Sequence, residues 1–517
     1  MSIKKTIILG IFIPFILVNC SNKSSGNHSP LAAISTDLTS GAAPLSVTFD
    51  ASASSDPDGD PIEFSWNFGD GSSSSSVRVT HTYINPGTYT ATLTVSDDKN
   101  ASSSASVTIT VLNEEPSGNT FYISPNGNDL NPGTESQPWR TLQHAADVVN
   151  PGETVYLMSG TYSSGMALER SGSAGSIILF KGADPSTVII DASSDNNRDC
   201  LFIENADYII IENITVRNAQ RAGLRLSYSN HITIKNCKFL NNTKWGIFTD
   251  FSDYTTIEGC EASGSKEEHG IYISNSSDFA AIKKNRCHNN EASGIQINAD
   301  PSMGGDGLSG DCTVDSNFCY ENGSSGGAAI NLASVRNSII SNNVIYNNLA
   351  GGIAAWDDGQ GDSWGSKNLQ ILNNTIYFRP GEGRWCISLK NGSSGCIIYN
   401  NLLFGGSRGG IQYDDTTFPS LTSDCNIFYS SGISWAVEND DSGIAYTLEE
   451  WKAFNYDLHS FSNQPSQVIV DIYSFNPHLT ANSPAIDCGT PVSISSDYEG
   501  DARPQKSGWD IGADEAL

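Results

Sequence analysis

Gly270-Ile-Tyr-Ile273 and Gly294-Ile-Gln-Ile297 are two copies of the pattern that decides the fold: a small residue followed by an apolar, any and an apolar residue. The copies begin at Gly223, Gly246, Gly270, Gly294, Ala329, Gly352, Cys386 and Gly410. Their starts lie 23, 24, 24, 35, 23, 34 and 24 residues apart. A period of this size, in a stretch rich in Asn, Gly and β-branched residues, predicts a solenoid of stacked β-strands. The two long intervals predict loops that leave the stack and flank a groove.

Alternation within each copy predicts which side chains face solvent. The residues one and three places after the small residue should point into the solenoid, and the residue between them should point outward. The resulting outward column is Arg225, Phe248, Tyr272, Gln296, Asn331, Ala354, Ser388 and Gln412. Rings cover the apolar faces of sugars and amides bond their hydroxyls. The residues predicted to bind a sugar chain are therefore Arg225, Phe248, Tyr272, Gln296 and Asn331 of this column and Trp356 of the next column. An ordinary solvated face is the alternative.

Asparagines and cysteines recur at fixed places in the repeat. A second strand in each rung is followed by Asn236, Asn285, Asn317, Asn342-Asn343, Asn373-Asn374 and Asn400-Asn401. These side chains are expected to stack and to hydrogen-bond along the axis. Cys237 and Cys260 share one column, and Cys287 and Cys319 share another, with rungs about 4.8 Å apart. We expect stacked free thiols, and a strained disulfide is the alternative.

The N-terminus has the features of an export signal. Met1-Ser-Ile-Lys-Lys5 is followed by an apolar run from Thr6 to Val18. The run ends in Leu17-Val-Asn-Cys20, which resembles a bacterial lipobox apart from Asn19. The resemblance implies a signal peptide at residues 1–19, lipid attachment at Cys20, and a membrane-anchored protein at the outer membrane or cell surface. An uncleaved anchor is the alternative. Residues 20–30 form a polar tether.

Residues 31–112 alternate apolar and polar residues in about seven short runs, which predicts an immunoglobulin-like β-sandwich. Trp66-Asn-Phe-Gly-Asp-Gly71, His81-Thr-Tyr83 and Pro86-Gly-Thr-Tyr89 resemble the PKD module. Trp66 should fill the core, and the glycines should allow the turn. A spacer role is expected, with glycan binding as the alternative. Residues 113–119 break the periodicity and form a linker.

Residues 120–517 resemble extracellular right-handed parallel β-helix proteins of the pectin-lyase-like fold. The resemblance rests on Thr120-Phe-Tyr-Ile123, on Pro138-Trp-Arg-Thr-Leu142 and on a closing segment that includes Arg503-Pro504 and Asp510-Ile-Gly-Ala-Asp514. Similar proteins include polysaccharide lyases of family nine and the chondroitinase B and alginate lyase group. Residues 141–149 predict a short amphipathic helix that covers the open end of the solenoid.

The composition limits the partners. Lys and Arg number 28 against 57 Asp and Glu, a net charge of −29. Such a chain repels nucleic acid, so no nucleic-acid partner is expected. We expect a monomer whose partner is an extracellular polysaccharide. Solubility alone also explains much of the acidity, although clustered carboxylates can hold Ca²⁺.

Lys390 is the predicted catalytic residue. The resemblance to family-nine lyases implies a lysine base and a Ca²⁺ ion held by aspartates, which neutralises the carboxylate of a uronic acid. The aspartates assigned to the metal are Asp357, Asp358, Asp362 and Asp414, and they match the family's cluster only in part. The alternative is a salt bridge of Lys390 on an acidic surface. Glu267, Glu268 and His269 form another acid–base group, or solvated turn residues.

Three functions are compatible with these features. The first is a Ca²⁺-dependent lyase or epimerase-like enzyme on acidic extracellular glycans. The second is a non-catalytic glycan-binding or adhesin-like surface protein, because a solenoid fold does not by itself imply chemistry. The third is a glycoside hydrolase with paired carboxylates.

Overall fold

The computed structural model describes residues 27–85, 87–112, 119–433, 435–471 and 476–516. The chain divides into two compact units, Met1–Glu114 and Glu115–Leu517. The predicted signal peptide, Cys20 and nearly all of the predicted linker lie outside the described residues. Within the described residues, no helix combines the length and the apolar character needed to cross a membrane.

The N-terminal unit is a β-sandwich, as its alternating sequence predicts. One sheet holds β1 (Ser35–Thr36), β3 (Leu45–Asp50) and β6 (Arg78–Tyr83), and the other holds β2 (Ser40–Ala42), β4 (Ile62–Asn67), β5 (Ser73–Ser74), β7 (Gly87–Asp97) and β8 (Ser102–Leu112). Trp66 is buried, and its Nε1 donates to the carbonyl of Ser76 at 2.9 Å. Gly69 has φ +83°, and a Cβ there would lie 2.8 Å from the Thr90 carbonyl oxygen. Both residues therefore have the structural roles predicted for them.

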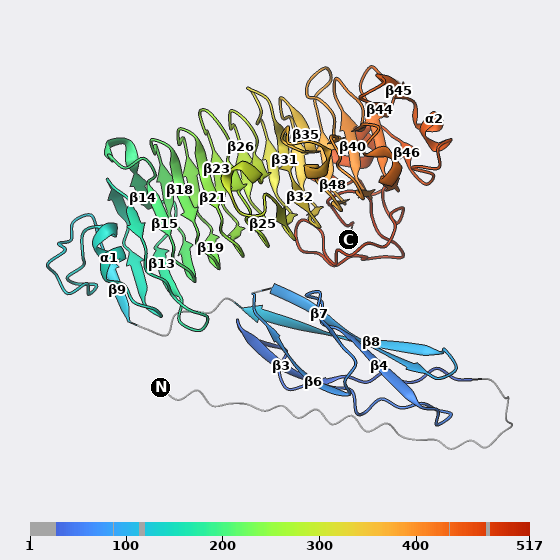
Figure 1. The fold of residues 1–517 in the computed structure, drawn as a ribbon, viewed down its shortest axis with the longest axis horizontal. Coiled ribbons are helices and arrows are strands. Elements are labelled where there is room, and N and C mark those ends of the chain that lie inside the picture. Colours follow the sequence, from blue (N-terminus) through green and yellow to red (C-terminus); the bar gives the residue numbers. More distant parts are fainter. Residues whose placement is uncertain (1–26, 86, 113–118, 434, 472–475, 517) are drawn as a thin grey trace. The chain divides into compact units, whose positions relative to one another are not determined.

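The second unit is a parallel β-helix of three sheets with 12 strands each (Figure 1). The first sheet contains β9 (Thr120–Ile123), β10 (Thr154–Leu157), β13 (Ile178–Gly182), β16 (Ile209–Glu212), β19 (Ile232–Lys235), β22 (Thr256–Glu258), β25 (Ala281–Lys283), β29 (Thr313–Asp315), β33 (Ile339–Ser341), β36 (Gln370–Leu372), β39 (Ile397–Tyr399) and β42 (Thr422–Asp424). The second contains β11 (Gly160–Tyr162), β14 (Val188–Asp191), β17 (Thr215–Arg217), β20 (Lys238–Leu240), β23 (Glu261–Ser263), β26 (Arg286–His288), β30 (Phe318–Tyr320), β34 (Val344–Tyr346), β37 (Thr375–Tyr377), β40 (Leu402–Gly405), β43 (Ile427–Ser430) and β46 (Phe461–Ser462).

The third sheet carries the repeat and is the one that positions the candidate site. Its strands are β12 (Met166–Leu168), β15 (Leu201–Glu204), β18 (Ala222–Ser227), β21 (Trp245–Asp250), β24 (Ile271–Ser274), β27 (Ile295–Asn298), β31 (Ala328–Ala333), β35 (Gly351–Trp356), β38 (Ile387–Leu389), β41 (Ile411–Tyr413), β44 (Val437–Asn439) and β45 (Ile444–Tyr446). All of these strands pair in parallel except β44 and β45, which form an antiparallel hairpin at the end. The register aligns Phe248 with Tyr272 and Gln296 with Asn331, so the predicted outward column is confirmed.

Close approach between rungs explains the small residue that begins each copy. A Cβ on Gly246 would lie 2.6 Å from the carbonyl oxygen of Gly270, and one on Gly352 would lie 2.4 Å from that of Cys386. Real side chains do not approach so closely, so larger residues there would push the rungs apart. The inward residues that follow, such as Ile271 and Ile295, are completely buried and form the apolar core.

A ladder of asparagine side chains runs along the inside of the turn after the first sheet. Nδ2 of Asn285 donates to Oδ1 of Asn317 at 3.0 Å. The same bond joins Asn317 to Asn343, Asn343 to Asn374, Asn374 to Asn401, and Asn401 to Asn426. Because these buried amides have partners, they stabilise the stack instead of opposing it.

The ladder includes the first cysteine pair, which corrects one detail of the prediction. The amide of Cys260 donates to Oδ1 of Asn285 at 2.9 Å, and the amide of Cys237 donates to Sγ of Cys260 at 3.4 Å. Cys237 therefore holds the place predicted for Asn236, which lies one residue earlier with φ +51°. Cys287 and Cys319 pair in register, and the ten cysteines of the described chain are free thiols.

Short helices cover both ends of the solenoid. At the first rungs, α1 (Leu142–Val148) begins after the N-cap Thr141 and buries Leu142 in the core, as predicted. At the last rungs, α2 (Leu448–Lys452) has the capping box between Thr447 and Glu450. The remaining elements are α3 (Pro465–Val468), β28 (Ser309–Gly310), β32 (Val335–Arg336), β47 (Ile469–Asp471), β48 (Asn476–Leu479) and the 3₁₀ turns η1 (Ala192–Ser194), η2 (Pro301–Met303), η3 (Asp362–Trp364) and η4 (Phe418–Ser420).

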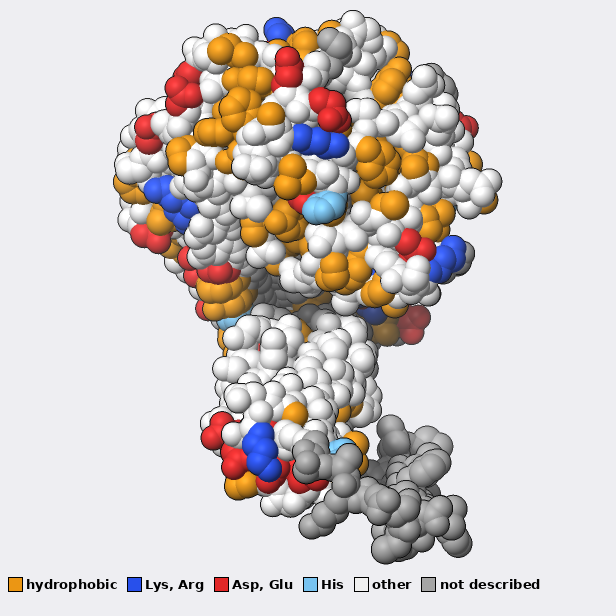
Figure 2. Space-filling model, turned by 90° about the vertical axis from the view of Figure 1, so that its right-hand side faces the viewer, with side chains coloured by type: hydrophobic (Ala, Val, Ile, Leu, Met, Phe, Trp, Pro, Cys, Tyr) orange, Lys and Arg blue, Asp and Glu red, His pale blue; other side chains and the backbone are white. Residues whose placement is uncertain are grey.

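The closing segment packs on the outer face of the second sheet near its end. Ile511 and Ala513 join a buried cluster with Leu402 and Phe404. Arg503 and Glu515 form an ion pair at 2.8 Å whose side chains are 0% and 1% exposed. Figure 2 views this end of the solenoid, where acidic, basic and apolar side chains are interspersed over the surface.

Candidate functional site

A pocket of about 350 Å³ opens on the outer face of the third sheet, around β31, β35 and β38. Its floor is the outward column, at Asn331, Ala354 and Ser388. Trp356, Lys390, Asn391 and Asp440 line the side where the strands end, and Gly327 and Arg384 line the side where they begin. Two cations, a carboxylate, two amides and a hydroxyl thus share one recess, a composition that suits a polar, charged ligand.

Hydrogen bonds fix the polar groups of the floor. The Ser388 hydroxyl donates to Oε1 of Gln412 at 2.9 Å, and Nε2 of Gln412 donates to Oδ1 of Asp440 at 2.7 Å. Nζ of Lys390 donates to the other oxygen of Asp440, also at 2.7 Å. Lys390 therefore lines the pocket, and it forms a salt bridge, which is the alternative role that the sequence suggested for it.

Asn391 links two of the aspartates that the sequence assigned to a metal. Its Nδ2 donates to Oδ1 of Asp357 at 2.8 Å, and its backbone amide donates to Oδ2 of Asp414. The amides of Gly359 and Gly361 also donate to Asp357. Burial acts to raise the pKa of Asp357, but the hydrogen bonds from Asn391 and the two glycine amides outweigh it and lower the pKa.

The Asp414 carboxylate also accepts several hydrogen bonds from neighbouring residues. Its Oδ1 accepts from the hydroxyl of Thr416 at 2.7 Å and from the amide of Thr417 at 2.9 Å. Burial acts to raise the pKa of Asp414, and the hydrogen bonds from Thr416, Asn391 and Thr417 lower it. Both carboxylates therefore serve as acceptors for the turns that shape the pocket wall.

The four aspartates do not fit a calcium cage. Asp357 and Asp414 accept three hydrogen bonds each, Asp358 accepts one from Nδ2 of Asn298 at 2.9 Å, and Asp362 is exposed at the start of η3. Calcium needs six to eight converging oxygens with free lone pairs. The donors that surround Asp357 and Asp414 already use most of theirs, so we derive no catalytic step through Ca²⁺.

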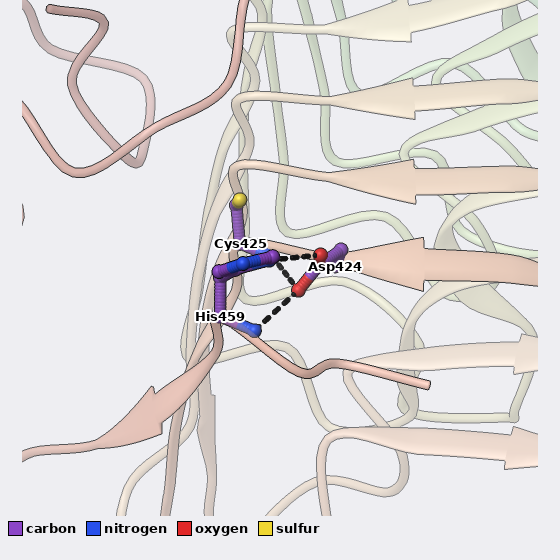
Figure 3. A group of neighbouring side chains, drawn as sticks. All are labelled: Asp424, Cys425 and His459. Carbon is purple, nitrogen blue, oxygen red and sulfur yellow. Dashed lines mark hydrogen bonds and ion pairs between the residues drawn. The ribbon is translucent and has the colours of Figure 1, made fainter. Parts of the chain in front are cut away.

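The potential metal-ligand groups within the described residues lie elsewhere in the chain. They are Asp424 with Cys425 and His459, His478 with Glu499 and Asp514, and Asp56 with Asp58 and Asp60. In the first group, the bonds from His459 and from the Cys425 amide end on the Asp424 carboxylate, and none reaches the sulfur (Figure 3). The Asp424 carboxylate thus accepts hydrogen bonds that hold the adjacent turn in place.

The predicted sugar-binding residues separate into two sets. Asn331 and Trp356 line the pocket and bond each other, Nε1 of Trp356 donating to Oδ1 of Asn331 at 3.2 Å. Arg225, Phe248, Tyr272 and Gln296 lie on earlier rungs outside the pocket. Phe248 and Gln296 are 9% and 4% exposed, because neighbouring side chains of the column cover them.

The earlier rungs are filled by contacts among their own side chains. Nη2 of Arg225 bonds Oδ2 of Asp250 at 2.7 Å, and the Arg225 guanidinium lies over the Phe248 ring at 5.8 Å. Trp245 stacks on Phe248 with centroids 4.4 Å apart. Phe248 meets Tyr272 edge to face at 5.2 Å. These contacts cover the outward face of the sheet at the rungs of Arg225, Phe248 and Tyr272, which we call the closed end of the column; the rungs that form the pocket are its open end.

Each of the two long intervals carries a loop at the edge of the sheet where its strands end. Residues 299–308 follow β27, and residues 357–366 follow β35. A Cβ on Gly307 would lie 2.8 Å from the Trp364 ring, so the loops contact each other. Gly327 and Arg384, which line the opposite wall of the pocket, belong to the same two intervals, 294–329 and 352–386, so residues of both intervals flank the recess.

Arg384, Asn391 and Asp440 are pocket residues that the sequence interpretation missed. Arg384 stands two places before the small residue Cys386, a position that the repeat numbering identifies but that carries no motif. Asp440 follows β44, where the repeat has already decayed, so its contact with Lys390 could not be read from spacing. Asn391 adjoins Lys390 and resembles the structural asparagines of the turns.

Comparisons with known proteins support the fold of both units. Residues 27–111 match the PKD domain family, and residues 121–262 match a family described as Pel9A-like, right handed beta helix region. The crystal structure of pectate lyase Pel9A is similar over 77% of this chain and 97% of that one, with a TM-score of 0.55 and 18% identity. At that identity the similarity concerns the fold.

Two curated proteins match part of the sequence. The uncharacterized protein YwoF of Bacillus subtilis is 36% identical over 110 residues, 20% of this chain and 24% of that protein. Pectate lyase PEL9 of Emericella nidulans is 34% identical over 103 residues, 17% of this chain and 25% of that protein. The chain thus spans about a quarter of the length of these relatives. The pocket lies beyond the family match at residues 121–262.

Proposed function

We propose that this chain is a surface protein that acts on acidic extracellular polysaccharides through lyase or epimerase-type chemistry in the pocket at β35 and β38. The observation that carries the proposal is the pairing of Arg384 and Lys390 in one open recess with an amide and a hydroxyl on its floor. A uronic acid offers a carboxylate for the cations and hydroxyls for the floor. The Pel9A-like solenoid and the partial match to a pectate lyase add support.

Both reactions begin with the same step. A base removes the proton from the sugar carbon beside the carboxylate, and the electron pair of that bond moves toward the carboxylate. In elimination, the pair then forms a carbon–carbon double bond as the bond to the neighbouring sugar's oxygen breaks and that oxygen gains a proton. In epimerisation, a proton returns to the opposite face.

We assign the base to Lys390. To act as a base, Nζ must first give up a proton to water, and its 2.7 Å ion pair with Asp440 must open so that the free amine can reach the sugar. Gln412 holds Asp440 in place from the other side.

The test is incubation of the full chain with pectate, alginate and chondroitin, following the absorbance of unsaturated products and, in heavy water, exchange of the sugar proton. Lys390→Ala should lower the rate at least about 100-fold. Lys452→Ala is the matched control, because Lys452 is paired with Glu449 on α2. An active Lys390→Ala protein would refute the base assignment, and absence of product and exchange with all three polymers would refute the enzymatic function.

Glycan binding without chemistry is the second candidate. The 2.7 Å ion pair with Asp440 supports it, because Lys390 is a hydrogen-bond donor in this structure. Binding of a uronate polymer without product or exchange would favour this function.

We further propose that Cys20 carries a lipid that anchors the chain to the cell surface, with the PKD unit as a spacer. The lipobox-like sequence supports this. Labelled palmitate should enter the protein expressed in bacteria but not Cys20→Ala. Equal labelling of the two proteins would contradict the anchor.

A further inference from the structure

We propose that Arg384 binds and neutralises the carboxylate of the acidic sugar, the task that a metal ion performs in a calcium-dependent lyase. The inference rests on the proposed function and deepens it, since it names the ligand group and the residue that receives it. It starts from the observation that the aspartates predicted to bind calcium accept hydrogen bonds from the chain itself.

Arg384 belongs to a column of side chains that runs along the edge where the strands of the third sheet begin. The register of the sheet places these residues on successive rungs: Arg221, Lys244, Glu268, Ala292, Gly327, Ala350, Arg384 and Arg408. Backbone bonds from Lys244 to Arg221 and from Arg384 to Ala350 agree with this alignment. Four of the eight members are cations.

Three of these cations already have carboxylate partners. Arg221 pairs with Asp199, Lys244 lies 3.2 Å from Glu268, and Arg408 lies 3.9 Å from Glu438. Among the described residues, the Arg384 side chain has no ion-pair or hydrogen-bond partner, although it lines the pocket. An unpaired guanidinium offers five N–H donors to an incoming anion, and a carboxylate can take two of them in parallel.

The surroundings of Arg384 keep it at the mouth of the pocket. Its backbone amide donates to the carbonyl of Ala350 at 2.9 Å. The next residue, Trp385, is buried and packs on Trp435 with centroids 5.1 Å apart. The preceding members of the column, Gly327 and Ala350, are small, so the approach to the guanidinium from the earlier rungs stays open.

The opposite wall explains why a protein side chain is needed for this task. Asp357 and Asp414 accept hydrogen bonds from Asn391 and from the backbone amides of the turns that follow them, and a metal ion would have to displace those donors. A guanidinium on the other wall needs no such rearrangement. It would stabilise the negative charge that moves onto the carboxylate when the adjacent proton leaves.

The experiment measures binding of galacturonate, alginate and neutral cellulose trisaccharides to the full chain by calorimetry, once with Ca²⁺ and once with a chelator. We expect the acidic trisaccharides to bind equally in both buffers. Arg384→Ala should weaken that binding about 100-fold, and Arg384→Lys should restore part of it, because one charge remains without the bidentate geometry. Arg408→Ala, its neighbour on the next rung, should bind like the wild type.

The outcomes separate this inference from the proposed function. If the wild type binds no acidic sugar, the proposed function fails, and Arg384 has no carboxylate to bind. If the wild type binds acidic sugars but only with Ca²⁺, or if Arg384→Ala binds as tightly as the wild type, the inference alone is overturned. Unchanged thermal unfolding of Arg384→Ala would show that a loss of binding is not a loss of folding.

Discussion

The earlier and later rungs of the third sheet share one scaffold but differ in how their outward side chains are partnered. Around Phe248, rings and ion pairs fill the surface, and the Arg225 guanidinium is bonded to Asp250. Around Ser388, small residues leave a pocket, and no described residue pairs with the Arg384 side chain. The two regions therefore differ in packing: large side chains cover the earlier rungs, and small ones leave the later rungs open. Changes at the closed end should therefore affect stability, and changes at the open end should affect binding.

The largest effect is expected for Phe248→Ala at the closed end. Phe248 is 9% exposed and contacts Trp245 and Tyr272, so its removal should lower the free energy of unfolding by about 3 kcal/mol. Binding of acidic sugars should not change. Trp356→Ala, at the open end, should weaken binding more than it lowers stability. Urea unfolding and calorimetry measure the two quantities, and a Phe248→Ala protein that loses binding while folded would break the comparison.

A second effect concerns pH. Burial lowers the pKa of His269 to about 4, although the nearby Glu268 acts to raise it. The unfolded chain protonates this residue near its ordinary pKa of about 6.5, so between these values the unfolded state binds more protons. Stability should therefore fall by about 2 kcal/mol as the pH drops from about 6.5 to about 4.

The control for that window is His269→Asn. Nδ1 of His269 accepts from the amide of Ser293 at 3.1 Å, and an asparagine oxygen can take this bond but does not titrate. The variant should lose the part of the pH dependence that His269 contributes. An unchanged pH profile of thermal unfolding would contradict the assignment.

The smallest expected change in stability is for two cations, Arg221 and Arg408, in the column where the strands of the third sheet begin. Arg221 and Asp199 are 16% and 8% exposed, so Arg221→Ala should lower stability by about 1.5 kcal/mol by leaving a mostly buried carboxylate unpaired. Arg408 is 53% exposed at 3.9 Å from Glu438, and its removal should cost less than about 0.5 kcal/mol. If both substitutions lowered the free energy of chemical unfolding equally, the ion pairs of Arg221 and Arg408 would not differ in strength.

The repeat predicts much of this architecture because its signal is local and is repeated. The place of Gly246 or Ile271 in the pattern determines the strand, its direction and the column, and the register confirms them. The two capping helices were also predictable, from Thr141 and from the Thr447–Glu450 box.

The site was less predictable because it depends on which polar atoms remain available. The sequence shows four aspartates near Lys390, but it does not show that the amides of Gly359, Gly361 and Thr417 occupy two of them. Nor does it show that, within the described part of the chain, the Arg384 side chain lacks a partner while Arg408 has one. Such differences arise from loop conformations and from a hairpin beyond the last regular repeat.

The hydrogen bonds of the asparagine ladder all run in one direction, from each Nδ2 to the Oδ1 of the next rung, so the last Nδ2 needs a different acceptor. Each side-chain amide donates toward the later rung, from Asn285 through to Asn426. Nδ2 of Asn426 then donates to Oδ1 of Asp457, a buried carboxyl group that burial keeps at a raised pKa. At the other end, the preceding place holds the sulfur of Cys260 instead of another amide. The ladder therefore ends on two different groups, the thiol of Cys260 at its start and the carboxyl group of Asp457 at its end.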